Sequence, residues 1–291
     1  MGVLNRVTIF GGSGFVGRQT VQKLAKSGAV ITVVTRSAER VKSLRPLGEV
    51  GQIVPMVVPL DDRGLSEAIA GADAVINLLG TVTARARAME ALHFHTAQKI
   101  AEIAAAESVK RLVHVSALGA SDRSHSVYSR SKFAGAAAGR QAFTRATILS
   151  PSLIIGADAA LVKQILLMAR WLPMVPMIAA ETRFQPVQVN DVAEAIRVAA
   201  TEDFAAGKDY DIGGPEVLTM RQIYGRIMDG VAPSARTIAL PTGLALAMAR
   251  VLQNLPGRAM TVDQIRMTED ATVVGSKALK LADLGITAEG V

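Results

Sequence analysis

A phenol and an ammonium group stand four residues apart in the segment Tyr128-Ser-Arg-Ser-Lys132. On a helix, this spacing brings both side chains to the same side. A nearby ammonium group favours the phenolate and lowers the pKa of a tyrosine, so the pair is suited to proton transfer. The same spacing is also common by chance, and the elements around the pair must decide between the two interpretations.

Two apolar runs ahead of this pair end in residues that could face a ligand. Ser116 closes one run, and Asn77, Leu78 and Gly80 lie at the close of an earlier one. If both runs are strands of one parallel sheet, these ends meet at its carboxyl edge, where open α/β sheets bind ligands. Ser116 could orient a substrate oxygen there or only satisfy backbone groups. The earlier segment could let a cofactor approach or form an ordinary turn.

Three glycines at three-residue spacing follow the first apolar run, at positions 11, 14 and 17. The first permits a tight turn, the second lets a pyrophosphate approach the backbone, and the third lets helix and strand pack closely. The helix that follows would present bare N–H groups and the positive end of its dipole to an anion. A merely tight turn is the alternative, but the preceding strand pattern and following helix pattern favour dinucleotide binding. We predict cofactor contacts along the whole turn: Gly11, Gly12, Ser13, Gly14, Phe15, Val16 and Gly17.

The second apolar run ends in Arg36 and Ser37, with Arg40 one helical turn later. A site that prefers NAD usually places a carboxylate here to hold the ribose 2′-hydroxyl. Arg36 instead offers a planar cation to a 2′-phosphate, and Ser37 adds a hydroxyl and an N–H group. A solvated surface arginine is the alternative interpretation. The sequence therefore favours NADP(H) as the cofactor.

A bound dinucleotide would give the Tyr128/Lys132 pair its role. Lys132 could reach the cofactor ribose, and Tyr128 could exchange a proton beside the nicotinamide. Ser116, Tyr128 and Lys132 are thus the candidate catalytic residues, and Tyr128 and Lys132 are also candidate cofactor contacts.

Strand and helix patterns alternate through the first half of the chain, which predicts βαβ units and a doubly wound, parallel Rossmann sheet of the α/β class. The predicted strands cover residues 6–10, 30–35, 53–58, 74–78, 112–116 and 146–149. The predicted helices cover residues 15–28, 37–45, 64–70, 88–107 and 127–143.

After Pro151 the regular alternation of strand and helix patterns ends. A Met-rich apolar segment at 165–178, interrupted by two prolines, predicts a lobe or lid rather than a sheet. Helices are expected at 191–201 and 241–255, and a further strand at 209–212. We predict a dinucleotide-binding domain over 1–150 and a small, mostly helical lobe over 151–291, with elements near 185–215 returning to the sheet.

Composition narrows the functional classes. The absence of cysteine excludes disulfides and thiolate chemistry and suits a reducing, cytoplasmic compartment. The four histidines are not spaced for a metal site, and no run is long and apolar enough to span a membrane. A net charge of +7 suits an anionic partner, but scattered basic residues with 4% aromatics argue against nucleic acid. The Met-rich segment is either core or a contact with lipid, quinone or a hydrophobic partner.

Together these residues resemble the extended and atypical branch of the short-chain dehydrogenase/reductase superfamily. More narrowly, the chain resembles the family of NADPH-binding accessory subunits of respiratory complex I and their bacterial homologues over almost its whole length. The stretches that carry the resemblance lie at 11–17, 46–54, 111–119, 128–132, 183–192 and 213–217.

The resemblance implies a Rossmann core that holds NADPH through the glycine turn and Arg36. It also implies contacts near the nicotinamide from Asn77, the Tyr128/Lys132 pair and the Pro151-Ser152 turn. The complex I subunit is understood to use NADPH structurally, whereas related bacterial chains include candidate free reductases and quinone-related proteins.

The chain departs from the family pattern at several positions. Val58 stands where relatives tend to carry Asp or Asn for the adenine amine. Ala117 and Leu118 follow Ser116 where catalytic members commonly show further Ser or Thr, which puts the third member of a Ser/Tyr/Lys triad in doubt. The sequence ends at Val291, short of the tail expected in complex I homologues.

Two functions follow from these features. In the first, the protein is a cofactor-binding accessory or assembly factor that contacts respiratory complex I, a quinone or the inner face of the cytoplasmic membrane. In the second, it is an NADPH-dependent reductase, or an epimerase or dehydratase, acting on a small carbonyl or quinone. Then Tyr128 would donate a proton and Ser116 would orient the oxygen.

Overall fold

The computed structural model describes residues 4–229, 236–254 and 260–290. At its centre is a seven-stranded parallel sheet with the order β3-β2-β1-β4-β5-β6-β11. The strand order reverses between β1 and β4, which makes the carboxyl ends of these two strands the switch point of the sheet. The strands are β1 (Arg6–Phe10), β2 (Val30–Thr35), β3 (Ile53–Val57), β4 (Ala74–Asn77), β5 (Arg111–Val115), β6 (Thr147–Pro151) and β11 (Asp209–Ile212).

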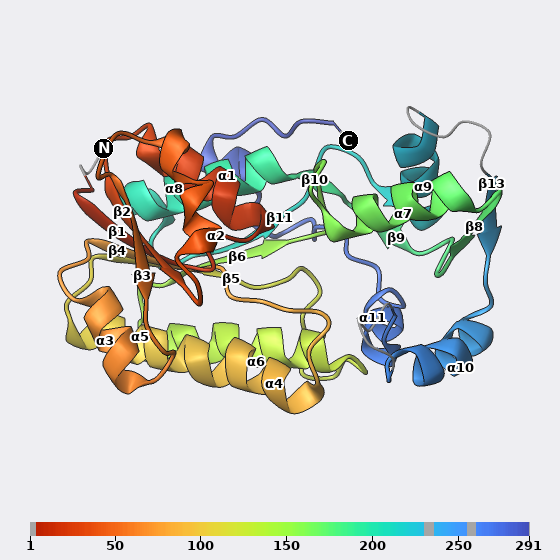
Figure 1. Cartoon of the computed structure of the whole chain (residues 1–291), viewed down its shortest axis with the longest axis horizontal. Helices are drawn as coiled ribbons and strands as arrows, with labels where there is room; N and C mark the ends of the chain where they lie inside the picture. Colours follow the sequence, from red (N-terminus) through yellow and green to blue (C-terminus); the bar gives the residue numbers. More distant parts are fainter. Residues whose placement is uncertain (1–3, 230–235, 255–259, 291) are drawn as a thin grey trace.

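Helices cover both faces of the sheet (Figure 1). One face packs against α1 (Phe15–Ala25) and α8 (Val189–Thr201), and the other against α3 (Asp62–Ile69), α5 (Thr96–Ala106) and α6 (Val127–Ala142). Successive strand residues alternate between the two cores, as Ile9 and Phe10 do, because side chains of a strand point to opposite faces. The predicted doubly wound α/β fold is confirmed.

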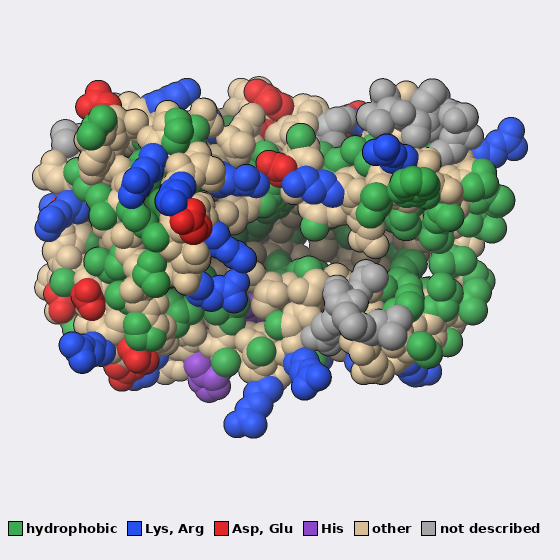
Figure 2. Space-filling view, viewed as in Figure 1, with side chains coloured by type: hydrophobic (Ala, Val, Ile, Leu, Met, Phe, Trp, Pro, Cys, Tyr) green, Lys and Arg blue, Asp and Glu red, His purple; other side chains and the backbone are tan. Residues whose placement is uncertain are grey.

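Other helices and three small sheets lie beside the central sheet, and we call this part of the molecule the lobe. It contains α7 (Ala160–Trp171), α9 (Met220–Asp229), α10 (Thr242–Leu252) and α11 (Val262–Met267). Three two-stranded sheets accompany these helices: β7 (Ile154–Ile155) with β10 (Val187–Gln188), β8 (Met174–Met177) with β13 (Arg236–Ala239), and β9 (Arg183–Phe184) with β12 (Leu218–Thr219). Figure 2 shows the surface hollowed between the sheet and the lobe.

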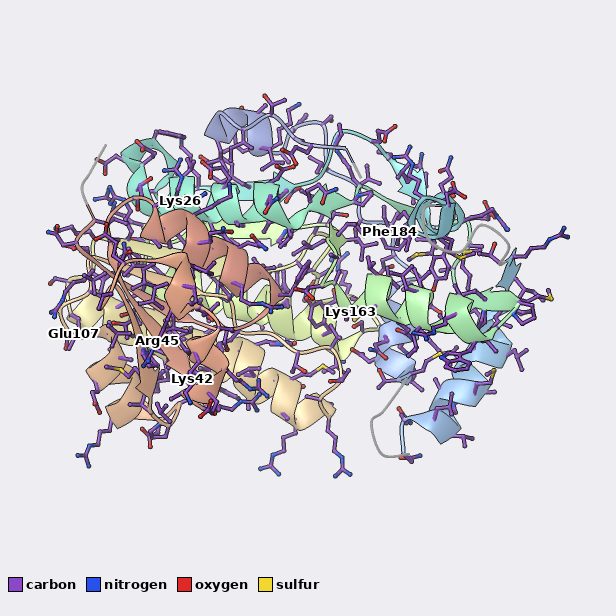
Figure 3. The ribbon with its side chains drawn as sticks, turned by 45° about the horizontal axis from the view of Figure 1, so that its top comes forward. Lys26, Lys42, Arg45, Glu107, Lys163 and Phe184 are labelled. Atoms are coloured by element: carbon purple, nitrogen blue, oxygen red, sulfur yellow. The ribbon has the colours of Figure 1, made fainter. Side chains whose placement is uncertain are left out.

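Charged side chains join the lobe to the sheet. Arg18 of α1 and Lys163 of α7 both pair with Asp158, at 3.1 Å and 2.6 Å. Figure 3 shows Lys163 at the start of α7, next to the sheet-bearing part. After α11 the chain runs back to the sheet, where Leu279 bridges to Tyr210 of β11. The predicted division at residue 150 stays a prediction.

Two predicted helices differ in the structure. The helix expected at 37–45 is only α2 (Glu39–Lys42), followed by a 3-10 turn η1 (Arg45–Leu47), because Pro46 lacks the N–H that would donate to the Lys42 carbonyl. The helix expected at 88–107 consists of α4 (Ala86–Glu90), a π-helical segment η2 (Ala91–His95) and α5.

The Met-rich segment was predicted to contain no sheet, and this is wrong for its second half. Residues 174–177 form β8 and pair with β13, a strand about 60 positions later in the chain. Such a distant pairing leaves no local pattern. The remaining short elements are η3 (Asp203–Ala205) and η4 (Leu281–Leu284).

Candidate functional site

The glycine turn joins β1 to α1 and leaves no room for side chains. Gly11 adopts φ +82°, and the Gly14 N–H donates to its carbonyl at 2.9 Å. A Cβ atom on Gly17 would lie 2.4 Å from that same carbonyl oxygen, so only glycine fits there. Gly14 caps α1 without a side-chain hydrogen bond, and the first turn of α1 carries no acidic residue. This bare, uncrowded helix start fits a cofactor pyrophosphate.

The remaining residues of the turn differ in what they face. Gly12 is buried against Val33 of β2, Ser13 is half-buried, and Val16 packs on the core of the sheet. The Phe15 ring packs with the lobe, 3.0 Å from the Cβ position of Gly156. Phe15 therefore fastens the turn to the lobe, leaving its backbone as the part that can face a ligand.

Arg36 lies at the carboxyl end of β2, next to the glycine turn because β1 and β2 are neighbours. Its side chain is exposed and makes no ion pair or hydrogen bond within the described part of the chain. Arg40 on α2 is exposed as well. The Ser37 N–H, expected to face a 2′-phosphate, instead donates to the Thr35 hydroxyl at 3.2 Å.

The segment after β4 runs between the glycine turn and Lys132. The Leu78 carbonyl oxygen lies 3.0 Å from the Cβ position of Gly11, and the Lys132 Nζ atom lies 3.4 Å from the Cβ position of Gly80. The Asn77 side chain is buried and occupied: its Oδ1 accepts from the Leu79 N–H, and its Nδ2 lies 3.2 Å from His114 Nδ1. Asn77 therefore shapes this segment rather than reaching outwards.

The Lys132 ammonium group is buried against backbone. Its Nζ donates to the carbonyl oxygens of Leu79 at 3.0 Å and Val115 at 2.9 Å, which ties α6 to the ends of β4 and β5. Burial lowers the pKa of Lys132 to about 8. One ammonium N–H is left for a ligand, since an ammonium group has three donors.

Tyr128 differs from the sequence-based expectation in the direction of its pKa. We expected Lys132 to lower it, but burial raises the pKa of Tyr128 to about 12. The Tyr128 hydroxyl has no hydrogen-bond partner among the described residues. Its ring instead meets His93 edge-on, with centroids 5.4 Å apart. Without a ligand, the phenol is therefore protonated at neutral pH and free to donate.

The Ser116 hydroxyl is bonded within the protein and does not donate to the Tyr128 phenol. This buried hydroxyl donates to the Lys132 carbonyl oxygen at 3.3 Å, so its proton is used inside the fold. Leu118 is buried too, and its N–H donates to the Pro151 carbonyl. Lys132 therefore lies against the segment after β4, which also contacts the glycine turn, while the Ser116 hydroxyl holds α6 against the end of β5.

The Pro151-Ser152 turn is held by the C-terminal part of the chain. Pro151 ends β6 and is buried. The Ser152 hydroxyl donates to the Thr272 carbonyl at 2.9 Å and accepts from the Gln185 N–H. The Ser152 side chain is thus occupied, and its contact with a cofactor stays a prediction.

Sequence reasoning missed a buried histidine in this site. The Nε2 atom of His93 accepts from the Thr81 N–H at 3.0 Å, and its Nδ1 lies 2.8 Å from the Ser131 hydroxyl. Since Ser131 donates to the Tyr128 carbonyl, Nδ1 must carry the proton and the ring is neutral. Burial and the neighbouring Lys132 lower the pKa of His93 to about 3. Its four-residue spacing from the buried Met89 and Ala97 is the signal that could have placed His93 inside and His95 outside.

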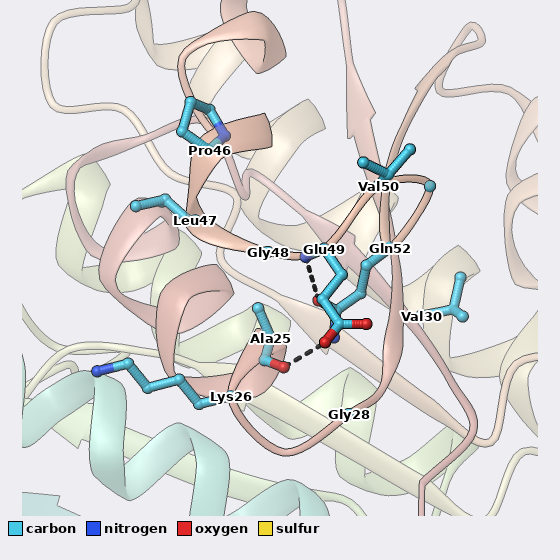
Figure 4. Close-up of a pocket in the computed structure, with 11 residues that line it drawn as sticks. Ala25, Lys26, Gly28, Val30, Pro46, Leu47, Gly48, Glu49, Val50 and Gln52 are labelled. Carbon is cyan, nitrogen blue, oxygen red and sulfur yellow. Dashed lines mark hydrogen bonds between the residues drawn. The ribbon is translucent and has the colours of Figure 1, made fainter.

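A cavity of about 630 Å³ lies at the other edge of the sheet (Figure 4). Its walls include the end of α1 at Ala25, the start of β2 at Val30, and the loop ahead of β3 with Glu49 and Gln52. These are amino-terminal strand ends, one helix length from the glycine turn, so this cavity is not the dinucleotide cradle.

The residues that the structure describes contain no group of three or more His, Asp and Glu side chains placed to hold a metal ion. They also contain no helix long and apolar enough to cross a membrane.

The parallel sheet, the glycine turn at its switch point and the Tyr128/Lys132 pair define an NAD(P)H-binding protein of the short-chain dehydrogenase/reductase class. A family model described as NAD(P)H-binding matches residues 11–152. The chain is 35% identical to NADH dehydrogenase (ubiquinone) 1 alpha subcomplex subunit 9 of Arabidopsis thaliana, covering 96% of this chain and 73% of that one. The chain belongs to the family of this subunit, an atypical branch of the class.

Two further comparisons mark the range of relatives. The ceramide reductase of Caulobacter vibrioides is 29% identical over 64% of this chain and 58% of that protein. The solved structure of MoeE5 in complex with UDP-glucuronic acid and NAD has a TM-score of 0.73 at 16% identity, covering 99% of this chain and 95% of the other. At this identity the second comparison concerns the fold alone.

Proposed function

We propose that the protein is an NADP(H)-binding accessory or assembly protein of a respiratory NADH dehydrogenase. The observation that carries the cofactor choice is Arg36, an exposed and unpaired cation where an NAD site would hold a carboxylate. A planar guanidinium group can bind a phosphate through two parallel hydrogen bonds. The accessory role is supported by the likeness to the plant subunit along 96% of this chain.

The side chains near the nicotinamide end support a structural use of the cofactor. Lys132 spends two of its three donors on backbone carbonyls, and Ser116 donates into α6. The raised pKa of Tyr128, about 12, disfavours a phenolate. These groups are arranged to hold the ends of β4 and β5 around a ligand, and none of them is poised as a base.

The lobe supplies a surface for the partner. Its exposed apolar side chains gather at the end of the molecule away from the sheet (Figure 2). The elements that carry them, α7, β8, β13 and α10, contain four basic residues and no acidic ones. We call these apolar residues, which are 40–73% exposed, the lobe surface: Leu167, Trp171, Leu172, Met174, Ile238, Leu244, Met248 and Val251. An apolar surface with basic residues suits the anionic membrane face beside a respiratory complex.

The cofactor proposal is tested by thermal shift and by direct titration. NADPH should raise the melting temperature, since a ligand at 100 times its Kd stabilises by about 2.7 kcal/mol, whereas NADH should have little effect. Arg36→Ala should weaken NADPH binding by about tenfold or more, because a charge-assisted hydrogen bond contributes about 1.5–3 kcal/mol. Arg63→Ala, an exposed arginine on α3, is the matched control. Equal affinities for NADPH and NADH would overturn the NADP(H) assignment.

A reductase is the second candidate, and the unpaired Tyr128 hydroxyl favours it. Bound NADPH would supply the hydride, and Tyr128 would give its phenolic proton to the carbonyl oxygen of the substrate. Tyr128→Phe separates the two candidates. In an enzyme it abolishes NADPH oxidation by carbonyl or quinone substrates while sparing cofactor binding. In an accessory protein no such oxidation occurs, and the variant binds NADPH as the unmodified chain does.

A further inference from the structure

A carboxylate of the lobe caps the helix that carries Tyr128. Asp263, in α11, accepts from the Val127 N–H at 2.6 Å, from the Tyr128 N–H at 3.1 Å and from the Ser126 hydroxyl at 3.1 Å. These partners form the first turn of α6, more than 130 positions earlier in the chain. A negative charge at this end also complements the dipole of α6. Asp263 therefore links the start of α6 to the lobe, and Arg266 of α11 adds a longer contact of 3.4 Å to the His125 carbonyl just before it.

The position of Asp263 depends on a small unit made of α10 and α11. Ile265 of α11 packs with Ala245 and Ala249 of α10 in a core of their own, separate from the cores of the sheet. Thr261 and Gln264 form a capping box that starts α11 one position before Asp263 is reached. Any displacement of α11 therefore moves the carboxylate.

The opposite side of the same unit belongs to the lobe surface. On α10, Leu244, Met248 and Val251 are 51%, 40% and 66% exposed, whereas Ala245 and Ala249 are fully buried. Within the described part of the chain, the core formed with α11 covers one side of this helix and leaves the other side exposed. A contact on its exposed side would act on α11, and through Asp263 on the first turn of α6.

A small movement of α6 would displace the side chains that it carries into the candidate site. Among the described residues, the Tyr128 hydroxyl has no hydrogen-bond partner, and the Tyr128 ring packs edge-on against His93. Lys132, one turn further along α6, reaches two carbonyl oxygens through Nζ. A shift or rotation of α6 would change both groups together while leaving the glycine turn and Arg36, on other elements, in place.

We infer that Asp263 is a positioning residue that couples the α10–α11 unit to the nicotinamide end of the NADP(H) site. The inference rests on the proposed function, in which Tyr128 and Lys132 face the nicotinamide half and Arg36 faces the 2′-phosphate. It assigns the lobe a second task besides partner contact: it sets how the cofactor is held at the end where chemistry would occur.

The test compares the whole cofactor with its adenine half. Asp263→Asn keeps the size of the side chain but places an amide donor against donors of α6. We expect NADPH to bind about tenfold more weakly to this variant, whereas 2′,5′-ADP, which lacks the nicotinamide half, binds unchanged. Glu269→Gln, at an exposed acidic residue just after α11, should change neither affinity.

Two further variants keep the test independent of folding. Ile265→Ala loosens α11 without touching α6, and should weaken NADPH but not 2′,5′-ADP. Asp263→Glu retains the carboxylate and should restore part of the NADPH affinity. A circular dichroism melt of each variant shows whether it is folded. A purely structural role predicts that both ligands weaken together or that neither does, and either result would overturn the inference. Failure of both ligands to bind the unmodified chain would instead refute the proposed function.

Discussion

Two histidines of the π-helical segment, His93 and His95, are only two positions apart but differ in burial and in hydrogen bonding. His93 is 1% exposed and bonded to Thr81 and Ser131, whereas His95 is exposed. His93→Ala should lower the free energy of unfolding by roughly 2–4 kcal/mol, because it opens a cavity and leaves the part-buried Thr81 N–H without its acceptor. His95→Ala should change it by less than about 0.5 kcal/mol. Urea unfolding of both variants measures the difference.

The same residue makes stability depend on pH. The unfolded chain takes up a proton on His93 near its ordinary pKa of 6.5, but the folded chain does so only near 3. The unfolded state therefore binds more protons between these values, and stability falls as the pH falls, by about 1.4 kcal/mol per unit for one group. The buried His114, whose pKa burial also lowers to about 3, adds a second such group.

His93→Ala should remove one of these two contributions. Between pH 6 and pH 5, the unfolding free energy of the variant should fall less steeply than that of the unmodified chain, by about 1.4 kcal/mol per unit. Urea unfolding at several pH values gives both slopes. Equal slopes would mean that His93 is already protonated in the folded protein, contrary to its hydrogen bond from Thr81.

Helix α6 contains two glycines whose surroundings are opposite. A Cβ on Gly135 would lie 1.9 Å from the His93 carbonyl oxygen, whereas one on Gly139 meets nothing within 4 Å. Gly135→Ala should therefore destabilise the protein by roughly 2–3 kcal/mol, since α6 must move off the π-helical segment. Gly139→Ala should stabilise it by about 0.5–1 kcal/mol through helix propensity. Denaturant unfolding would contradict this packing if both substitutions changed stability in the same direction.

At the scale of elements, the sheet was predictable and the contacts around the site were not. The strands at 6–10 and 30–35 were predicted to the residue, because buried parallel strands are mostly apolar runs bounded by turns, and the edge strand at 209–212 was predicted from its alternating pattern and the glycines after it. The glycine turn was predictable because its spacing is local. The bonds of His93 to Thr81 and Ser131 have no comparable local pattern, because they join residues 12 and 38 positions away. Asp263 lies far from α6 in sequence, and only the tertiary fold shows that it caps this helix.

The type of a residue did not predict whether its polar atoms are free to bind a ligand. Ser116, Asn77 and Ser152 are at the expected edge, but their polar atoms are bonded inside the protein. A sequence shows that a hydroxyl or amide is present, whereas its free donors depend on neighbours brought from other strands. Arg36 is the opposite case. It is exposed directly after a strand, so its side chain stays free to bind a ligand, as its position in the sequence predicts.

At the scale of the whole molecule, exposed apolar side chains gather on the lobe together with basic residues (Figure 2). The chain has a net charge of +7, and the elements of the lobe surface contribute Arg170, Arg236 and Arg250, whereas Lys163 on α7 is paired with Asp158. Each basic residue near an anionic membrane contributes about 1 kcal/mol of attraction, and salt screens it. An apolar side chain that enters the interface adds about 1.5–3 kcal/mol when fully buried. Both contributions favour the lobe as the end that faces a membrane.

The one tryptophan of the chain makes this orientation measurable. Trp171 is 73% exposed on the lobe surface, with the Arg170 guanidinium 5.7 Å from its ring centroid. Vesicles of phosphatidylglycerol and phosphatidylcholine should shift its emission to shorter wavelength, because the indole leaves water. High salt or pure phosphatidylcholine should reduce the shift, since the basic residues then lose their attraction. The double variant Leu244→Ser/Met248→Ser should bind the anionic vesicles at least about tenfold more weakly.

Val50→Ser is the matched control for this variant, because Val50 is fully exposed at the amino-terminal edge of the sheet, away from the lobe. It should bind the vesicles as the unmodified chain does. If Trp171 emission does not respond to anionic vesicles, or if the double variant binds as tightly as the control, the lobe surface does not contact a membrane. The exposed side of α10 would then have to be covered by protein, and the same two variants, tested for retention on the purified respiratory complex, would show whether that complex covers it.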